Sequence, residues 1–248
     1  MSIRSFSSMA AQLNEAQTEP VRSMGFASFL NVDLKQILGR FLKWLIDKFD
    51  PYFASFVLPD GQRFMVTAFD AYVTLGMPIS GKEIMGCSRS LTDEEYDEVD
   101  APWHTTPELA CIPEFILAKK DGSESFKRNF MIYLANCFFS GPKNYYCSKT
   151  ILKYIKDVDQ IAYLDWCKFA MQNLITSVRH YKERKSAKGV RFDGLLFFLM
   201  LCRIEHHSIK WPEPSQECEN YGRTPWPCKG QSQGKDCGSS RGASLSGE

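Results

Sequence analysis

Apolar side chains recur at steps of three and four residues along much of this chain, and that spacing places them on one face of an α-helix. The first such stripe follows Asn31 or Asp33, either of which can cap the N-terminus of a helix. It ends at Asp50-Pro51, because a proline disfavours helical backbone in the residue before it. Its apolar members are Leu34, Ile37, Leu38, Phe41, Leu42 and Leu45. The sequence therefore predicts a mainly α-helical fold.

Further helices are predicted in the second half of the chain. The stretch from Phe126 to Phe139 ends at Gly141-Pro142, and Thr150 to Lys156 is a short helical stretch. Asp157-x-x-Gln160 resembles a cap that opens a longer helix, and Leu195 to His207 is apolar on nearly all sides, as a central, buried helix would be. The stripes of the two longer helices are Phe126, Phe130, Leu134 and Phe138, and Ile161, Leu164, Cys167, Met171, Leu174 and Val178, with Trp166 and Phe169 widening the second.

One segment has the features of a strand pair instead. Ser55–Pro59 and Gln62–Thr67 flank Asp60-Gly61, a dipeptide that suits a type I′ turn because both positions tolerate positive φ. This pattern predicts a small β-hairpin near residues 55–67. Thr67-x-x-Asp70 then resembles a capping box for a short helix that runs to about Gly76. The segment from Met77 to Gly81 interrupts the chain again.

Composition sets the expected limits of the folded domain. Residues 1–20 are polar and are predicted to be a flexible leader. Residues 212–248 hold six Gly, six Ser and four Pro, and they are predicted to be a disordered tail because they cannot bury enough surface to offset chain entropy. The domain is expected to span 21–211. Within it, residues 86–113 are interpreted as an exposed connection with at most one short helix, since 91–100 hold six acidic residues and no basic residue.

Charge and hydropathy exclude several classes of protein. The chain has 30 Lys+Arg and 29 Asp+Glu, whereas a wide nucleic-acid-binding face needs an excess of cations for its phosphate contacts. The longest apolar run, Leu195 to Cys202, has eight residues, and a membrane span needs about 20. The N-terminus lacks the apolar region of a secretory signal. Several of the nine cysteines lie in apolar stretches, where free thiols pack well, so an intracellular, reducing location is expected.

No constellation in the sequence predicts catalysis, a cofactor or a metal. The nearest approach to a zinc site lacks the closely spaced ligand pairs that such sites use, and a buried thiol beside solvent-facing histidines is the preferred interpretation. The residues considered for this zinc site are Cys202, His206, His207, Cys218 and Cys228. No cysteine has a protease signature around it, and Gly81-Lys82 precedes Glu83 rather than the Ser or Thr of a phosphate-binding loop. We therefore nominate no catalytic, cofactor-binding or metal-binding residue, and we predict that the chain is not an enzyme.

The basic stretch from Arg179 to Arg191 is the candidate interaction patch. Two functional interpretations, a nuclear-import patch and a phosphate-contact surface, compete with the solvated end of a helix, where cations favour the C-terminal dipole. The patch consists of Arg179, Lys182, Arg184, Lys185, Lys188 and Arg191.

Several segments, taken in order, resemble the plant mobile domain, also called the aminotransferase-like family, which occurs in plant transposons and in host genes derived from them. The resemblance covers about residues 21–208 and is closest to the version that lies upstream of Ulp1-type cysteine protease domains. Ala71 stands where that family usually has Val. The matching segments are Val21–Phe26, Phe56–Gly61, Thr67–Gly81, Phe126–Phe139, Asp157–Ile161, Asp165–Phe169 and Gly194–Leu199.

This resemblance implies a nuclear, non-enzymatic interaction module linked to transposon silencing, genome integrity and development. The partner would be a protein first, with chromatin or nucleic acid contacted indirectly and no membrane. The alternative is the non-catalytic remnant of a transposon-encoded protein formerly linked to a Ulp1-type SUMO cysteine protease. The name "aminotransferase-like" implies no activity here, because a pyridoxal-phosphate enzyme needs a Schiff-base Lys and an Asp partner for the pyridinium nitrogen, and neither can be nominated.

Overall fold

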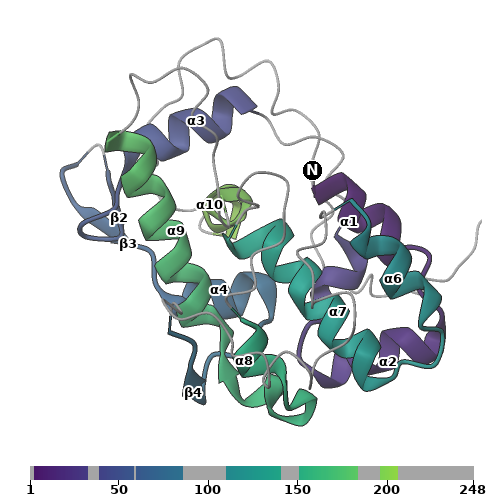
Figure 1. Cartoon of the computed structure of the whole chain (residues 1–248). Helices are drawn as coiled ribbons and strands as arrows, with labels where there is room; N and C mark the ends of the chain where they lie inside the picture. Colours follow the sequence, from purple (N-terminus) through teal and green to yellow (C-terminus); the bar gives the residue numbers. More distant parts are fainter. Residues whose placement is uncertain are drawn as a thin grey trace, which may run out of the picture. The chain divides into compact units, whose positions relative to one another are not determined.

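The fold is mainly α-helical with one small antiparallel sheet, which confirms the predicted fold class. The computed structural model describes residues 3–32, 39–58, 60–85, 110–140, 151–183 and 196–205. The predicted tail, the acidic run 91–100 and the stripe positions Leu34, Ile37 and Leu38 lie outside these residues. Figure 1 shows the elements in chain order from purple to yellow.

The N-terminal residues form two helices, so the prediction of a flexible leader over 1–20 is wrong. Helix α1 spans Ile3–Ala10 and helix α2 spans Glu15–Ser23. Phe6, Met9 and Ala10 lie at helical spacing and are buried, and the ring of Phe6 packs against Phe130, Tyr133 and Phe138. A short stripe in a polar segment is thus enough to join the core, because its apolar members all face the same side.

Helix α2 begins at a capping box that also ties it to the rest of the fold. The side chain of Asn14 accepts a hydrogen bond from the backbone of Gln17, and the side chain of Gln17 accepts one from the backbone of Asn14. The amide of Gln17 is fully buried and donates to the carbonyls of Ile116 and Lys119 at 3.2 and 3.0 Å. These carbonyls lie at the end of helix α6 (Ile112–Ala118).

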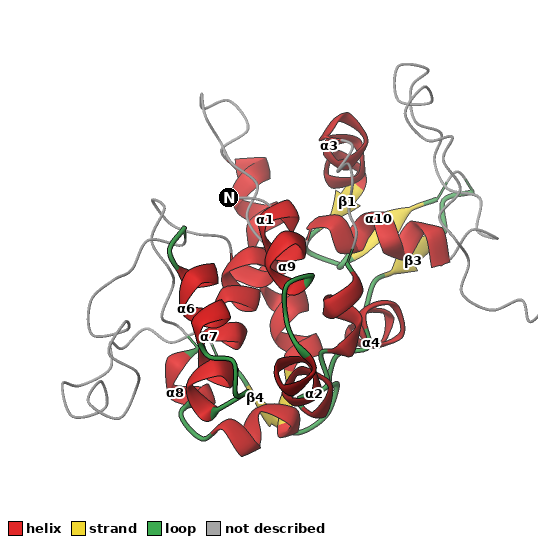
Figure 2. Cartoon of the chain, turned by 90° about the vertical axis from the view of Figure 1, so that its right-hand side faces the viewer, coloured by secondary structure: helices red, strands yellow, loops and turns green. Residues whose placement is uncertain are grey.

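A three-stranded antiparallel sheet follows the 3₁₀ turn η1 (Ala27–Asn31) and helix α3 (Gly39–Lys48). Its order is β1 (Phe49–Asp50), β2 (Ser55–Val57) and β3 (Arg63–Met65). The predicted hairpin is confirmed, with Phe56 opposite Phe64, whereas strand β1 was not predicted. Figure 2 shows the strands beside α3 and α10 (Leu196–Glu205).

The turn of the hairpin differs from the predicted type I′ turn. The backbone of Leu58 donates to Gln62, and Gly61 donates to Leu58, so three residues rather than two form the loop. Gly61 has a φ of +82°, while Asp60 is not among the described residues with positive φ. A three-residue loop closed by a left-handed glycine is the next most common hairpin connection.

Helix α4 (Ala68–Leu75) confirms the predicted capping box. The carboxylate of Asp70 accepts hydrogen bonds from the backbone and the hydroxyl of Thr67, both at 2.7 Å, and Gly76 ends the helix in the left-handed conformation. The following break leads into a two-residue strand, β4 (Lys82–Glu83), which pairs in parallel with β5 (Leu164–Asp165). Gly81 lies so close to β5 that a Cβ atom there would stand 1.9 Å from the carbonyl oxygen of Tyr163.

The predicted helix over 126–139 is present as helix α7 (Glu124–Leu134), which continues into the π-helical turn η3 (Ala135–Ser140). Its whole predicted stripe is buried. Helix α10 contributes buried Phe198, Leu199 and Cys202 and packs on α3 and α4, in agreement with a predicted buried helix.

The single long helix predicted from Asp157 is interrupted. The predicted stretch 150–156 contains α8 (Leu152–Ile155). Asp157 then caps the 3₁₀ helix η4 (Val158–Tyr163), strand β5 follows, and helix α9 begins only at Trp166 and runs to Glu183. Pairing with β4 keeps Leu164 extended, and the carboxylate of Asp165 accepts a hydrogen bond from the backbone of Lys168 in the first turn of α9. The predicted apolar stripe is nevertheless buried throughout, although its members lie in three elements: Ile161 in η4, Leu164 in β5 and the others in α9.

Candidate interaction surface and basic pocket

The exposed apolar residues of the described chain are concentrated in one segment. Seven of the nine large hydrophobic side chains that are exposed in the described ranges lie between residues 52 and 73. We call these seven the 52–73 surface. They are Tyr52, Phe53, Val57, Met65, Phe69, Tyr72 and Val73. Single exposed apolar residues need no explanation, whereas exposed apolar side chains that lie together mark interaction sites. Within this group, Tyr52 and Phe53 share one turn, and the rings of Phe69 and Tyr72 are neighbours on α4.

The antiparallel register of the sheet explains why Val57 and Met65 face outward. Side chains alternate between the two faces of a strand, and residues that are directly opposite share a face. Phe49 and Phe56 pair across β1 and β2, their rings lie 5.2 Å apart, and both are buried. The neighbouring pairs, Val57 with Arg63 and Ser55 with Met65, lie on the opposite face, where Val57 and Met65 are exposed although Ser55 is covered.

Asp50 organises the turn that presents Tyr52 and Phe53. One carboxylate oxygen accepts hydrogen bonds from the backbone of both residues, at 3.0 and 3.4 Å. The other oxygen pairs with Arg63 at 2.8 Å. The hydrogen bond from Arg63 lowers the pKa of Asp50, and the two backbone donors lower it further against the opposing effect of desolvation. The guanidinium of Arg63 also lies 4.3 Å from the centre of the Phe53 ring.

The predicted basic patch is only partly described. Arg184, Lys185, Lys188 and Arg191 lie outside the described residues. Arg179 is exposed, and its guanidinium stands over the Tyr52 ring at 5.3 Å. In the described part of the chain it makes no ion pair. Arg179 therefore joins the 52–73 surface as a second cation beside an aromatic ring.

Lys182 has a structural contact. Its ammonium group donates to the carbonyl oxygens of Asp47 and Phe49, at 3.1 and 2.6 Å, at the C-terminal end of α3. The last carbonyls of a helix lack backbone partners and carry partial negative charge, so a cation there is stabilising. Lys182 thus fixes α9 to the start of the sheet, and this accounts for one member of the predicted patch.

Helix α4 carries the remainder of the 52–73 surface. Phe69, Tyr72 and Val73 lie at i, i+3 and i+4 and therefore share one face of the helix. All three are exposed, and the rings of Phe69 and Tyr72 are 6.0 Å apart. The opposite side of α4 buries Ala71 and Leu75 and packs on α9 and α10. The sequence does not indicate which side of α4 is exposed, because both sides of the helix carry apolar residues.

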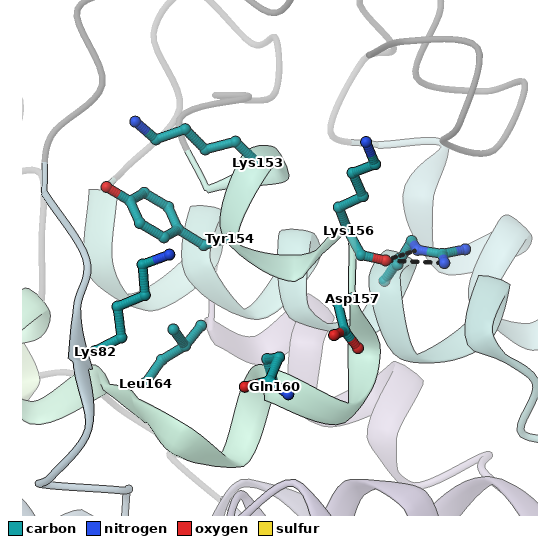
Figure 3. Close-up of a pocket in the computed structure, with 8 residues that line it drawn as sticks. Lys82, Lys153, Tyr154, Lys156, Asp157, Gln160 and Leu164 are labelled. Atoms are coloured by element: carbon teal, nitrogen blue, oxygen red, sulfur yellow. Dashed lines mark hydrogen bonds between the residues drawn. The ribbon is translucent and has the colours of Figure 1, made fainter.

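A second feature is a basic pocket between β4, α8 and η4, with a volume of about 540 Å³. Four cationic side chains line it, Lys82, Arg128, Lys153 and Lys156, together with a single carboxylate, that of Asp157. Figure 3 shows Lys82 on the β4 side of the pocket, whereas Lys153 of α8 and Lys156, the residue after α8, extend in different directions. The sequence did not indicate this pocket, because its cations come from segments up to 74 residues apart.

The walls of the basic pocket are held by hydrogen bonds. Arg128 donates to the carbonyl of Lys156 at 3.1 and 3.0 Å and pairs with Glu124 at 2.6 Å. The hydroxyl of Tyr154 donates to the carbonyl of Met85 and accepts from its backbone nitrogen. Behind the pocket, Glu83 of β4 pairs with Lys168 of α9 at 2.8 Å. These contacts fix the positions of β4 and α8 relative to α9.

Nucleophilic and metal-binding groups form no site among the described residues. Burial raises the pKa of the Cys167 thiol to about 12, with the charge of Asp165 adding to the effect, so this cysteine stays protonated. Cys167 donates to the carbonyl of Met77. Within the described ranges, no group of three or more His, Cys, Asp and Glu side chains could hold a metal ion. His206, His207, Cys218 and Cys228 lie outside those ranges. No helix in the described chain has the length and hydropathy to cross a bilayer.

These observations define a mainly helical domain with an exposed aromatic surface and a separate basic pocket. A family model matches residues 1–200, and the chain belongs to that family, which is described as a domain of unknown function (DUF8566). No curated protein and no solved structure matches the chain.

The family match corrects the resemblance to the plant mobile domain, which is wrong: no match to that family or to aminotransferase-like proteins is found, and the matching model is a different one. The residues that suggested it have local structural roles. Thr67 and Asp70 form a helix cap, Gly76 ends that helix, and Asp60-Gly61 lies in a hairpin loop. Caps and turns of this kind recur in unrelated helical folds, because they satisfy the same backbone groups everywhere.

Proposed function

We propose that this domain is a non-enzymatic protein-interaction module that binds an acidic partner segment with aromatic or aliphatic side chains through the 52–73 surface. The observation that carries the proposal is the concentration of exposed apolar side chains in residues 52–73, next to Arg63 and Arg179. The transposon, protease and nuclear associations depended on the corrected resemblance and form no part of this proposal.

The chemistry of the surface favours a protein partner. Aromatic and arginine side chains dominate the binding energy of protein interfaces, because they combine a large contact area with polar groups. Tyr52 is 75% exposed and Phe53 is 56% exposed, so each loses much water-accessible area when covered. The turn that carries them is fixed by Asp50, which lowers the entropy cost of ordering them on binding.

The charge of the surface favours an acidic partner. Arg179 makes no ion pair within the described chain, and its guanidinium lies over Tyr52. A carboxylate of the partner could pair with it while an apolar side chain covers the ring. The four cysteines of the described chain are free thiols, which supports an intracellular location as part of this proposal, because disulfides are rare in reducing compartments.

Site-specific photo-crosslinking tests the proposal. A benzophenone amino acid replaces Tyr52 in one variant and Tyr163, which is 67% exposed on η4, in the control. We expect a protein crosslinked from the Tyr52 position that is absent from the Tyr163 position. The crosslinked partner is then purified and its affinity for the full chain is measured by calorimetry.

The affinity measurement decides between the surface and an accidental contact. Tyr52→Ala and Phe53→Ala are each expected to weaken binding about 30-fold, the effect of losing an interface hot spot. Tyr163→Ala should change it by no more than about twofold, as surface substitutions elsewhere do. Arg179→Glu should weaken binding most at low salt, since it reverses a charge. Equal affinities for the Tyr52, Phe53 and Tyr163 variants would contradict the proposal.

A further inference from the structure

We propose that the edge of strand β3 binds an extended segment of the partner, which adds to the three-stranded sheet as a further strand. The inference deepens the proposed function and rests on it, because β3 (Arg63–Met65) lies within the 52–73 surface. The stretch of the partner that pairs with β3 carries no acidic residue. The acidic residue that pairs with Arg179 lies outside that stretch.

The hydrogen bonds between β2 and β3 decide which backbone groups face the edge. They cross at both ends of the pair, from Leu58 to Gln62 at 2.8 Å and from Val66 to the residue before β2 at 2.7 Å. In an antiparallel ladder, hydrogen-bonded pairs alternate with pairs that are not hydrogen-bonded. Phe56 and Phe64, which are opposite each other midway between these two bonds, are therefore a hydrogen-bonded pair. The backbone of Phe64 consequently faces β2.

The two neighbours of Phe64 present their backbone groups to the other side. Arg63 and Met65 each direct an N–H and a C=O away from β2, and β3 is the last strand of the described sheet. No described residue outside the sheet forms a hydrogen bond with the backbone of Arg63 or Met65. A row of unpaired N–H and C=O groups is completed by another extended chain, which repeats the ladder.

The edge is not covered by the side chains of β3. Met65 is 50% exposed. The guanidinium of Arg63 bonds to Asp50 of β1 and to the hydroxyl of Ser55 of β2. Since β2 and β1 both lie on the same side of β3, these bonds draw the Arg63 side chain away from the edge. The backbone groups at the edge therefore stay open to a partner.

The charges around β3 decide the chemistry of the stretch that pairs with it. Asp50 pairs with Arg63 at 2.8 Å and balances its charge. Asp60 and Asp70 flank the strand in the sequence, and the carboxylate of each accepts a hydrogen bond from a backbone N–H within two residues of β3, at 2.9 and 2.7 Å. Two carboxylates held near the ends of β3 repel an acidic residue in the paired stretch and favour a neutral or basic one.

The position of β3 connects it to both parts of the 52–73 surface. Met65 shares the exposed face of the sheet with Val57. Only Val66 and Thr67 separate β3 from α4, whose exposed face begins at Phe69. A strand of the partner on β3 therefore lies close to apolar side chains of the sheet and of α4. In this binding mode the backbone bonds supply affinity, and the side chains beside them supply specificity.

A pair of variants at Met65 tests the inference. The probe is the protein that crosslinks from Tyr52, purified by itself, and its affinity for the full chain is measured by calorimetry. Met65→Pro removes the outward N–H and keeps the ladder to β2, because proline is tolerated at an edge position whose N–H faces solvent. Met65→Ala is the matched control, since it removes the side chain and keeps the N–H.

We expect Met65→Pro to bind the probe about tenfold more weakly than Met65→Ala, the effect of losing one interface hydrogen bond. Equal affinities for the two variants would overturn the inference and leave the proposed function standing. A thermal melt checks that both variants are folded. If Met65→Pro is unfolded, a second measurement on the unaltered chain decides.

This second measurement is amide hydrogen exchange followed by NMR. In the free chain, the amides of Arg63 and Met65 should exchange about tenfold faster than the amide of Phe64, which is bonded to β2. Saturation with the probe should slow the two edge amides about tenfold or more. Unchanged exchange of both edge amides in the saturated complex would overturn the inference, although the contact at Tyr52 would remain.

Two further outcomes separate this inference from the proposed function. A benzophenone amino acid at Gln62, which is exposed next to β3, should crosslink to a stretch of the probe without acidic residues, and a crosslink within an acidic stretch would overturn the inference alone. If no protein crosslinks from Tyr52, the proposed function fails and the inference fails with it. Capture of a second copy of this chain would overturn the inference in favour of self-association.

Discussion

Replacing Gln17 by Leu tests whether the N-terminal helices belong to the folded domain. The amide of Gln17 is fully buried and makes three hydrogen bonds through its side chain: it accepts from Asn14 and donates to Ile116 and Lys119. Leu has a similar volume but no hydrogen-bonding group. At about 1 kcal/mol for each lost bond, the free energy of unfolding should fall by about 3 kcal/mol. The carbonyl of Ile116 keeps its hydrogen bond from the backbone of Lys119, so the expected loss comes from the side-chain bonds of Gln17 alone.

Urea unfolding followed by circular dichroism measures the change, because the midpoint and slope give the free energy of unfolding. Gln12→Leu is the matched control: Gln12 is exposed, its side chain bonds only to the carbonyl of Ser8, and its replacement should cost less than about 0.5 kcal/mol. Equal stabilities for the Gln17 and Gln12 variants would refute the reasoning. That result would mean that residues 1–20 are, after all, a leader without a part in the fold.

Three further predictions concern the core, the sheet and the cysteines. Trp166→Ala should lower the free energy of unfolding by about 3–5 kcal/mol, because Trp166 is fully buried among Phe26, Phe139 and Phe169. Urea unfolding measures this change, and a loss under about 1 kcal/mol would contradict the buried placement. The pKa of Asp50 is lowered from its ordinary value of 3.8, so the unfolded chain takes up the proton first and stability falls as pH drops below that value. Asp50→Asn should make this fall shallower in acid titrations, and an unchanged slope would count against the ion pair with Arg63. Because the pKa of Cys167 is raised to about 12, its thiol should resist iodoacetamide in the native protein, whereas exposed Cys111 should be labelled. Mass spectrometry of the labelled protein measures the order of modification, and modification of Cys167 first would refute its burial.

The sequence predicted best those elements whose signals are local. Most of the two long apolar stripes lies within single helices, Phe126 to Leu134 in α7 and Cys167 to Val178 in α9, and the Thr67–Asp70 cap needs only four residues. The β4–β5 pair could not be predicted, because two-residue strands have no measurable period and their partners are 82 residues apart. Helix α1 could not be predicted as part of the core either, because Phe6 is buried only through its contacts with Phe130 of α7 and Phe138 of η3.

The candidate sites were less accessible to sequence analysis than the fold. The basic stretch indicated Arg179 and Lys182 together, yet Lys182 caps α3 while Arg179 stands at an aromatic ring. A count of charges cannot separate these roles, since they depend on the end of α3 lying beside α9. The apolar residues of α4 gave a partial signal, because a short helix with apolar side chains at positions 68, 69, 71, 72, 73 and 75 cannot bury all of them against one neighbour.

Gly81 sets a limit on how this family can vary. Its φ is +121°, and any Cβ atom would meet the backbone of Tyr163, which cannot move without separating β4 from β5. A relative with a side chain at this position would therefore lose the strand pair and with it the placement of Lys82. Among homologues, glycine at position 81 and a cation at position 82 should consequently be gained or lost together, and this covariation gives a sequence marker for lineages that keep the basic pocket.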